Sequence, residues 1–161
     1  MKALIAVDLS DVSRGMLRVA RQYAKQLSAR VWLVHVAPPD PDFVGYEPGP
    51  QHVRDTVARE FHEEHRALHD EAGLFTASGL DATPLMIQGP TVQTLLDEAG
   101  KLGADVIMIG SHGHGVLRQM LMGSVCEGVL HKSTRPVLVI PIPKKPASSD
   151  HSETTTQFIP S

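Results

Sequence analysis

"VIMIGSHGHGVLRQMLMGSVCEGVL", residues 106–130, runs from an apolar stretch through a glycine-rich loop into a pattern typical of a helix. The apolar stretch does not alternate with polar residues, which is typical of a parallel strand covered on both faces. The loop contains Gly110, Gly113 and Gly123, and each glycine costs conformational entropy when it is ordered. We therefore expect the bare backbone to serve a purpose. Three purposes fit: a sharp turn without a ligand, a metal site on the loop histidines, or a cradle for an anion such as a phosphate chain.

Four other apolar runs predict the remaining strands. They are residues 3–7, 31–36 and 136–141, with a weaker run at 81–89. Pro84 lies near the start of the weaker run and predicts a strand near a sheet edge, because proline cannot donate a ladder hydrogen bond. Apolar residues at helical spacing predict four helices. The first covers 13–27 and the second roughly 51–72. The third opens at "GPT" (residues 89–91) and closes before Gly100 and Gly103, and the fourth follows Gly123. This alternation predicts an α/β fold, with an open five-stranded parallel sheet and helices on both faces.

The length and the composition predict a single domain with a polar extension. A chain of 161 residues suffices for one domain with a proper core. We expect that domain to cover residues 1–143, with a proline-rich surface loop at 37–50 and a polar tail at 144–161. For the tail, disorder and an arm anchored by its apolar end both remain open.

Charge, hydropathy and cysteine content exclude several classes of protein. The formal net charge of −3 argues against a nucleic-acid binder, because such domains usually carry a basic surplus. The longest apolar runs are far shorter than the ~20 residues of a membrane-spanning helix, and the N-terminus does not resemble a secretory signal. Cys126 is the single cysteine, so no internal disulfide can form. This fits a reducing compartment, and we expect a cytoplasmic protein without a membrane or nucleic-acid partner.

A ligand site is expected at the carboxyl edge of the predicted sheet, where open parallel sheets bind ligands. The first predicted strand leads into Asp8, the second ends at His35 and Val36, and the fourth ends at Gly110. The loop then enters a helix at Gly123, where unpaired N–H groups and the helix dipole favour an anion. The pattern therefore favours the cradle for an anionic ligand.

The spacing of the loop resembles a family signature. Gly110, two residues, Gly113, nine residues, Gly123 and Ser124 match G-x2-G-x9-G-[S/T], the signature of the nucleotide-binding branch of the universal stress protein family. The closing run "KSTRPVLVIP" is also similar to the last strand of that family. The resemblance extends from Lys2 to about Pro143, and it implies a Rossmann-like fold of the adenine nucleotide alpha hydrolase type.

The resemblance implies ATP as the ligand, with Mg²⁺ or Mn²⁺ on its phosphates. Asp8 would lie by the adenosine, Val36 would meet the adenine, and the glycines would let the chain pass close under the ribose and phosphates. A homodimer formed through the last strand, Pro136 to Pro141, is also implied. The residues implied to form the site are Ala6, Val7, Asp8, Val36, Gly110, Ser111, His112, Gly113, Gly123, Ser124, Val125 and Cys126.

Cys126 departs from the family pattern, which often has Ser or Thr two residues after the motif Ser. A thiol is a weak donor, so it would make a poor phosphate contact. Near a helix N-terminus the thiol could have a lowered pKa and react readily. The alternative, which we favour, is a small buried packing residue.

The histidines and the loop arginine allow further interpretations. His62, His65 and His69 lie at helical spacing, and the last two could chelate a metal, but a solvated or partly packed helix face is the favoured interpretation. His112 and His114 lie within the motif loop, where they could touch phosphates or solvent. Arg118 fits either a phosphate counter-charge or a surface arginine.

We interpret the sequence as an ATP-binding, nucleotide-regulated stress-response module. One alternative is a slow ATPase or self-phosphorylating enzyme, for which Asp8 is the one evident general base. The other is an interaction protein that works without a nucleotide, through the tail or the proline-rich loop.

Overall fold

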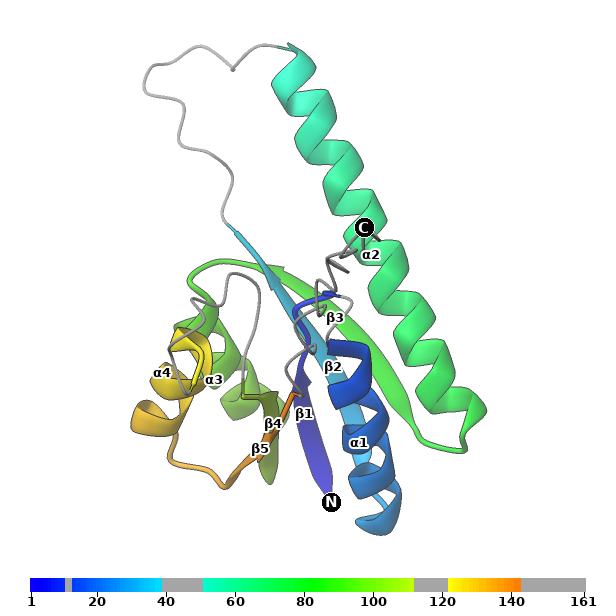
Figure 1. Ribbon diagram of the computed structural model, residues 1–161, viewed down its shortest axis with the longest axis vertical. Helices are drawn as coiled ribbons and strands as arrows, with labels where there is room; N and C mark the ends of the chain where they lie inside the picture. Colours follow the sequence, from blue (N-terminus) through cyan, green and yellow to red (C-terminus); the bar gives the residue numbers. More distant parts are fainter. Residues whose placement is uncertain (11–12, 39–50, 112–121, 143–161) are drawn as a thin grey trace, which may run out of the picture.

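The fold is a five-stranded parallel sheet between two pairs of helices (Figure 1). The computed structural model describes residues 1–10, 13–38, 51–111 and 122–142. In chain order the elements are β1 (Lys2–Ala6), α1 (Ser13–Gln26), β2 (Arg30–Ala37), α2 (Gln51–Ala77), β3 (Ala82–Gln88), α3 (Thr91–Leu102), β4 (Val106–Gly110), α4 (Ser124–Lys132) and β5 (Val137–Ile140). The predicted fold class is thus confirmed.

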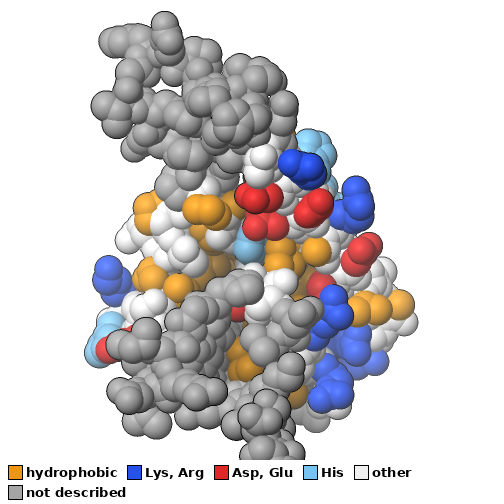
Figure 2. Space-filling model, turned by 45° about the horizontal axis from the view of Figure 1, so that its top comes forward, with side chains coloured by type: hydrophobic (Ala, Val, Ile, Leu, Met, Phe, Trp, Pro, Cys, Tyr) orange, Lys and Arg blue, Asp and Glu red, His pale blue; other side chains and the backbone are white. Residues whose placement is uncertain are grey.

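The order of the strands is β3-β2-β1-β4-β5, so the direction of strand addition reverses between β1 and β4. All pairs are parallel, and their carboxyl ends therefore share one edge, which is uppermost in Figure 1. Figure 2 turns that edge toward the viewer and shows acidic side chains and a histidine among apolar side chains. A reversal of this kind opens a crevice outside the strand ends, where ligands bind in such sheets.

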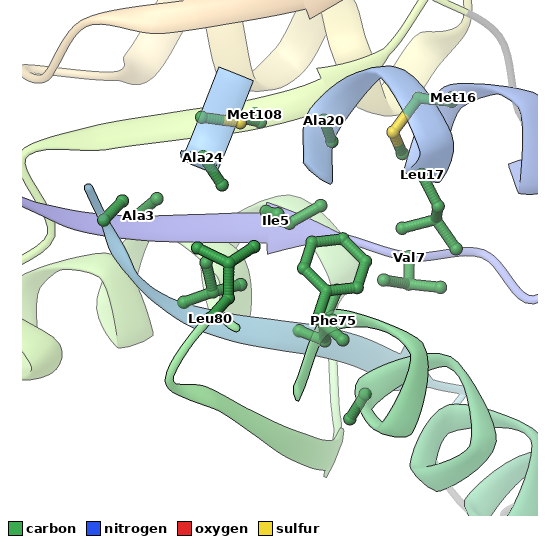
Figure 3. Close-up of a cluster of buried hydrophobic side chains, with 14 of the residues drawn as sticks. Ala3, Ile5, Val7, Met16, Leu17, Ala20, Ala24, Phe75, Leu80 and Met108 are labelled. Carbon is green, nitrogen blue, oxygen red and sulfur yellow. The ribbon is translucent and has the colours of Figure 1, made fainter. Parts of the chain in front are cut away.

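Each face of the sheet has its own hydrophobic core. One cluster joins β1 to α1 and α2, with Ile5, Leu17 and Phe75 almost fully buried (Figure 3). The other joins β1 to α3 and α4 through Leu4, Leu95 and other buried residues. Successive residues of a strand point to opposite faces, which explains why the apolar runs do not alternate with polar residues.

The edge position predicted for the weaker run is confirmed, since β3 is an outer strand. Pro84 lies opposite Leu33 of β2. A proline is tolerated there because an outer strand has a ladder on one side only. The predicted loop at 37–50 begins one residue later than expected, because Ala37 still belongs to β2, and residues 39–50 lie outside the described part of the chain. The polar tail at 144–161 lies outside it too.

Two helix predictions need correction. α3 continues through Gly100 and ends at Leu102, because the left-handed C-cap is Gly103, with φ 62° and an N–H that bonds to the carbonyls of Ala99 and Gly100. α2 extends to Ala77 rather than to about 72. Phe61 of this helix is 36% exposed, although its spacing from Leu68 puts it near the apolar side. Among the described residues, no helix combines the length and apolarity needed to span a membrane.

Replacement of Gly128 by alanine should overpack the contact between α3 and α4. An added Cβ at this position in α4 would lie 2.8 Å from Val92 Cγ2 of α3. Overpacking of this kind costs typically ~1–3 kcal/mol, which matches or outweighs the up to ~1 kcal/mol that alanine gains over glycine in a helix, so Gly128→Ala should be less stable than Gly100→Ala in urea denaturation. Gly100→Ala is the matched control, because nothing lies within 4 Å of the added Cβ. The control should be neutral or stabilising by up to ~1 kcal/mol, and equal effects of the two variants would contradict the close contact.

Candidate functional site

Some of the predicted site residues lie close together at the reversal of the strand order. β1 pairs with β4 through Ile5 and Met108, and with β2 through Ala6 and Val34. When these registers are continued, Asp8 lies level with Ser111 on one side and with Val36 on the other. Three segments far apart in the sequence thus meet at one point of the carboxyl edge.

The two ends of the glycine loop are joined by hydrogen bonds. The Gly123 N–H donates to the Ser111 carbonyl over 2.8 Å, and the Ser111 N–H donates to the Ile140 carbonyl over 2.9 Å. The Ser111 hydroxyl oxygen also accepts from the Ile142 N–H over 3.1 Å. Ser111 therefore ties the end of β4, the exit of β5 and the start of α4 together. His112, Gly113, His114 and Arg118 lie outside the described residues.

The N-terminus of α4 has the properties of an anion site. Gly123 is the N-cap, with φ −75° and ψ 148°, and no side chain caps the helix. Since the first N–H groups of a helix lack an acceptor within it, those of Ser124, Val125 and Cys126 are free of intrahelical bonds. The φ of Gly123 suits any residue, so the backbone conformation here does not itself require a glycine. The positive end of the helix dipole adds to the attraction for an anion.

One oxygen of the Asp8 carboxylate is hydrogen-bonded, and the other has no partner among the described residues. Its Oδ1 accepts from the Ser10 N–H over 3.1 Å and from the Ser10 hydroxyl over 2.8 Å. Its Oδ2 is buried, and no group in the described part of the chain bonds to it. Between them, Leu9 has a left-handed φ of 57°, a conformation that costs roughly 1–2 kcal/mol outside glycine. Buried unpaired polar atoms and such backbone strain cluster at functional sites.

The apolar candidates divide between the two faces of the sheet. Ala6, Val36 and Val125 pack against the core beneath α3 and α4, on the side where α4 begins. Val7 instead packs into the core beneath α1 and α2. Its N–H bonds to the Val34 carbonyl and its carbonyl accepts from His35. The structure therefore offers Ala6 and Val36 as an apolar wall, whereas both backbone groups of Val7 are already engaged. Gly110 ends β4 and is buried.

His35 is a component of this region whose contacts the sequence analysis did not anticipate. It lies in β2, is 7% exposed, and has its Nδ1 2.8 Å from the Val7 carbonyl. Its other ring nitrogen, Nε2, is buried, has no hydrogen-bond partner in the described part of the chain, and lies 3.6 Å from Glu64 Oε2 of α2. The one sequence signal was a histidine within the otherwise apolar run "VWLVHV".

The helix histidines do not form a metal centre among the described residues, where no cluster of three or more potential ligands occurs. His62, His65 and His69 are exposed on α2, and the rings of the last two lie 4.5 Å apart. The expected solvated helix face is thus what the structure shows.

The Cys126 side chain packs in the core and does not face a ligand. It is 2% exposed and belongs to the cluster beneath α3 and α4. Burial raises the pKa of the Cys126 thiol, which excludes the reactive thiol of lowered pKa and supports the packing residue. Its N–H remains part of the first turn of α4.

Comparison with known proteins identifies the family. The model of the universal stress protein family matches residues 1–141. The chain belongs to this family. Universal stress protein YxiE of Bacillus subtilis is 30% identical over 144 residues, which cover 86% of this chain and 97% of that one. Universal stress protein MJ0531 of Methanocaldococcus jannaschii is 32% identical over 145 residues, or 89% of this chain and 84% of its own.

Solved structures of the family share the fold. MJ0577 of M. jannaschii aligns with a TM-score of 0.74 at 23% identity and covers 89% of this chain and 97% of its own. A universal stress protein of Archaeoglobus fulgidus in complex with dAMP aligns with a TM-score of 0.57 at 22% identity, over 86% and 96% of the two chains. A further universal stress protein, solved in complex with cAMP, aligns with a TM-score of 0.61 at 22% identity and covers 89% of this chain and 98% of its own.

Cys126 should react slowly with a thiol reagent such as an aromatic disulfide. The raised pKa lowers the thiolate fraction near neutral pH, and the buried sulfur is reached only when the structure opens. The absorbance change at pH 7.5 should therefore develop much more slowly for the folded protein than for the protein unfolded in urea. Equal rates under the two conditions would contradict the buried position.

Proposed function

We propose that this universal stress protein binds ATP at the carboxyl edge of the sheet and acts as a nucleotide-regulated module of the stress response. The observation that carries the proposal is the meeting of Asp8, Val36 and the start of α4 at the reversal of the strand order. A negative charge, an apolar wall and a helix N-terminus are together suited to an adenosine that carries phosphates. The two solved universal stress proteins in complex with dAMP and cAMP bind ligands of this class, adenine nucleotides.

Each group has a role in this proposal. The unpaired Asp8 Oδ2 accepts hydrogen bonds from the ribose, and the apolar side chains of Ala6 and Val36 pack against the base. The N–H groups of Ser124 and Val125 donate to the phosphates, and each charge-assisted bond of this kind contributes ~1.5–3 kcal/mol. Gly110, Ser111, His112, Gly113, Gly123 and the Cys126 backbone complete the proposed site.

A divalent ion, Mg²⁺ or Mn²⁺, would be held mainly by the phosphates of the nucleotide. Such ions prefer oxygen ligands and usually combine one or two carboxylates with phosphate oxygens and water. The described residues contain no ready set of three protein ligands, and Asp8 is the carboxylate at the site. The residues present thus fit an ion that arrives with the nucleotide.

A homodimer through the last strand is part of the same proposal. β5 is an outer strand, and Val137, Leu138 and Val139 are only partly buried. An outer strand presents unpaired backbone groups on one side, which a second copy can pair. The proposed pairing covers Pro136 to Pro141. A cytoplasmic location is also proposed, from the single cysteine.

Millimolar ATP with Mg²⁺ should raise the thermal unfolding midpoint. Ligand at 100 times its dissociation constant stabilises the folded state by ~2.7 kcal/mol, which corresponds to about 5–10 °C for a chain of this length. Asp8→Asn should lose most of the shift, because an amide accepts weaker hydrogen bonds from the ribose hydroxyl groups than the carboxylate does. Asp81→Asn is the matched control, since Asp81 pairs with Arg30 at the opposite edge of the sheet. No shift in the native protein would contradict the proposal.

A further inference from the structure

The buried imidazole of His35 makes one hydrogen bond among the described residues, and that bond acts on the backbone next to Asp8. A carbonyl oxygen can only accept, so Nδ1 carries the proton that is donated to the Val7 carbonyl over 2.8 Å. This carbonyl belongs to the peptide group that joins Val7 to Asp8. The hydrogen bond from His35, a residue of β2, therefore fixes the orientation of that peptide group.

Among the described residues, the Val7 carbonyl and the Glu64 carboxylate are the polar groups that face the ring. The side chains on the same face of β2, Val31 and Leu33, are fully buried apolar residues, and a buried polar group is costly unless it is hydrogen-bonded. In the described part of the chain, the charged group that faces the ring is Glu64 from α2, whose Oε2 is 3.6 Å from Nε2. β3 places the uncharged Met86 opposite it.

The turn at residues 7–10, which His35 supports, is strained and is fixed by hydrogen bonds on both sides of the strained residue. The Val7 N–H donates to the Val34 carbonyl, Leu9 has a φ of 57°, and the Ser10 N–H donates to Asp8 Oδ1. A left-handed leucine persists only where its surroundings fix it. Loss of the support at Val7 would let the Val7–Asp8 peptide rotate, and the carboxylate would move with it.

We infer that His35 is a positioning residue of the nucleotide site, which holds the Val7–Asp8 peptide so that the Asp8 carboxylate stays at the crevice. Only the effect on nucleotide binding in this inference rests on the proposed function. The effect on the turn itself can be measured without any ligand. His35 does not contact the nucleotide in this scheme, because it lies on the face of the sheet beneath α2.

The experiment compares His35→Leu, which removes the donor, with His35→Asn, whose side-chain amide can place a donor near the position of Nδ1. The first measurement is amide hydrogen exchange at Ser10 in the nucleotide-free protein, followed by NMR. The second is the dissociation constant for ATP with Mg²⁺, by calorimetry. Leu33→Ala serves as the control, because it destabilises the same face of β2 without touching the Val7 carbonyl.

We expect Ser10 exchange to rise about tenfold in His35→Leu, beyond the change at core amides, and the dissociation constant to rise about tenfold, a factor that corresponds to ~1.4 kcal/mol. His35→Asn should restore both values to near those of the native protein. In an Asp8→Asn background, His35→Leu should cause no further loss of affinity, because its effect passes through Asp8.

Other results separate the two proposals. A selective rise at Ser10 in a protein that does not bind ATP would support the positioning role and overturn the proposed function. If the exchange rate at Ser10, relative to that of core amides, rises no more in His35→Leu than in Leu33→Ala, the positioning role is overturned, whether or not ATP binds. An unchanged dissociation constant in His35→Leu, with ATP bound by the native protein, would also overturn it.

Discussion

The position of β1 between β2 and β4 is the constraint on which the rest of the structure depends. β1 is paired on both sides, and Ala3, Leu4 and Ile5 have no exposed surface. The chain adds strands first to one side of β1 and then to the other, so the connections that follow β1 and β4 leave the carboxyl edge of the sheet in opposite directions. The space outside the carboxyl end of β1 is consequently left without a crossing helix.

The two cores contribute different parts of the proposed site. The core beneath α1 and α2 anchors the turn that follows β1, through Val7 and Leu9. The core beneath α3 and α4 fixes the start of α4, through Val125 and the buried Cys126. A nucleotide bound at the crevice would contact residues supported by both layers. Its binding energy would then stabilise the arrangement of the two layers relative to each other, which is a physical basis for regulation by occupancy.

Much of the fold could be predicted from the sequence, because buried parallel strands leave unbroken apolar runs. Pro84 even identified the outer strand. Gly100 misled the prediction of a helix end, since a glycine inside a helix weakens it only modestly and α3 is stabilised by packing. The orientation of Val7 was not predictable, because the sequence alone does not say which residue of an unbroken run faces which core.

The candidate site was predictable to the extent that it is local in the sequence. The spacing around Gly123 and the Asp8 at the end of β1 are local patterns. The bond from His35 to Val7 joins residues 28 positions apart, and it depends on a register that no single-sequence pattern specifies. A polar residue within an apolar strand was the only sign of it. The burial of Cys126 was expected, because a free cysteine is usually a buried packing residue.

The hydrogen bond between the Gly123 N–H and the Ser111 carbonyl has a consequence for the loop between these residues. It closes the glycine loop at its base, so that the sheet and α4 are joined independently of the residues between them. The entropy of closing a loop grows only slowly with its length, by ~0.6 kcal/mol for each doubling. A change in the number of residues between the two ends should therefore cost little folding free energy, because the joint between the sheet and α4 stays the same.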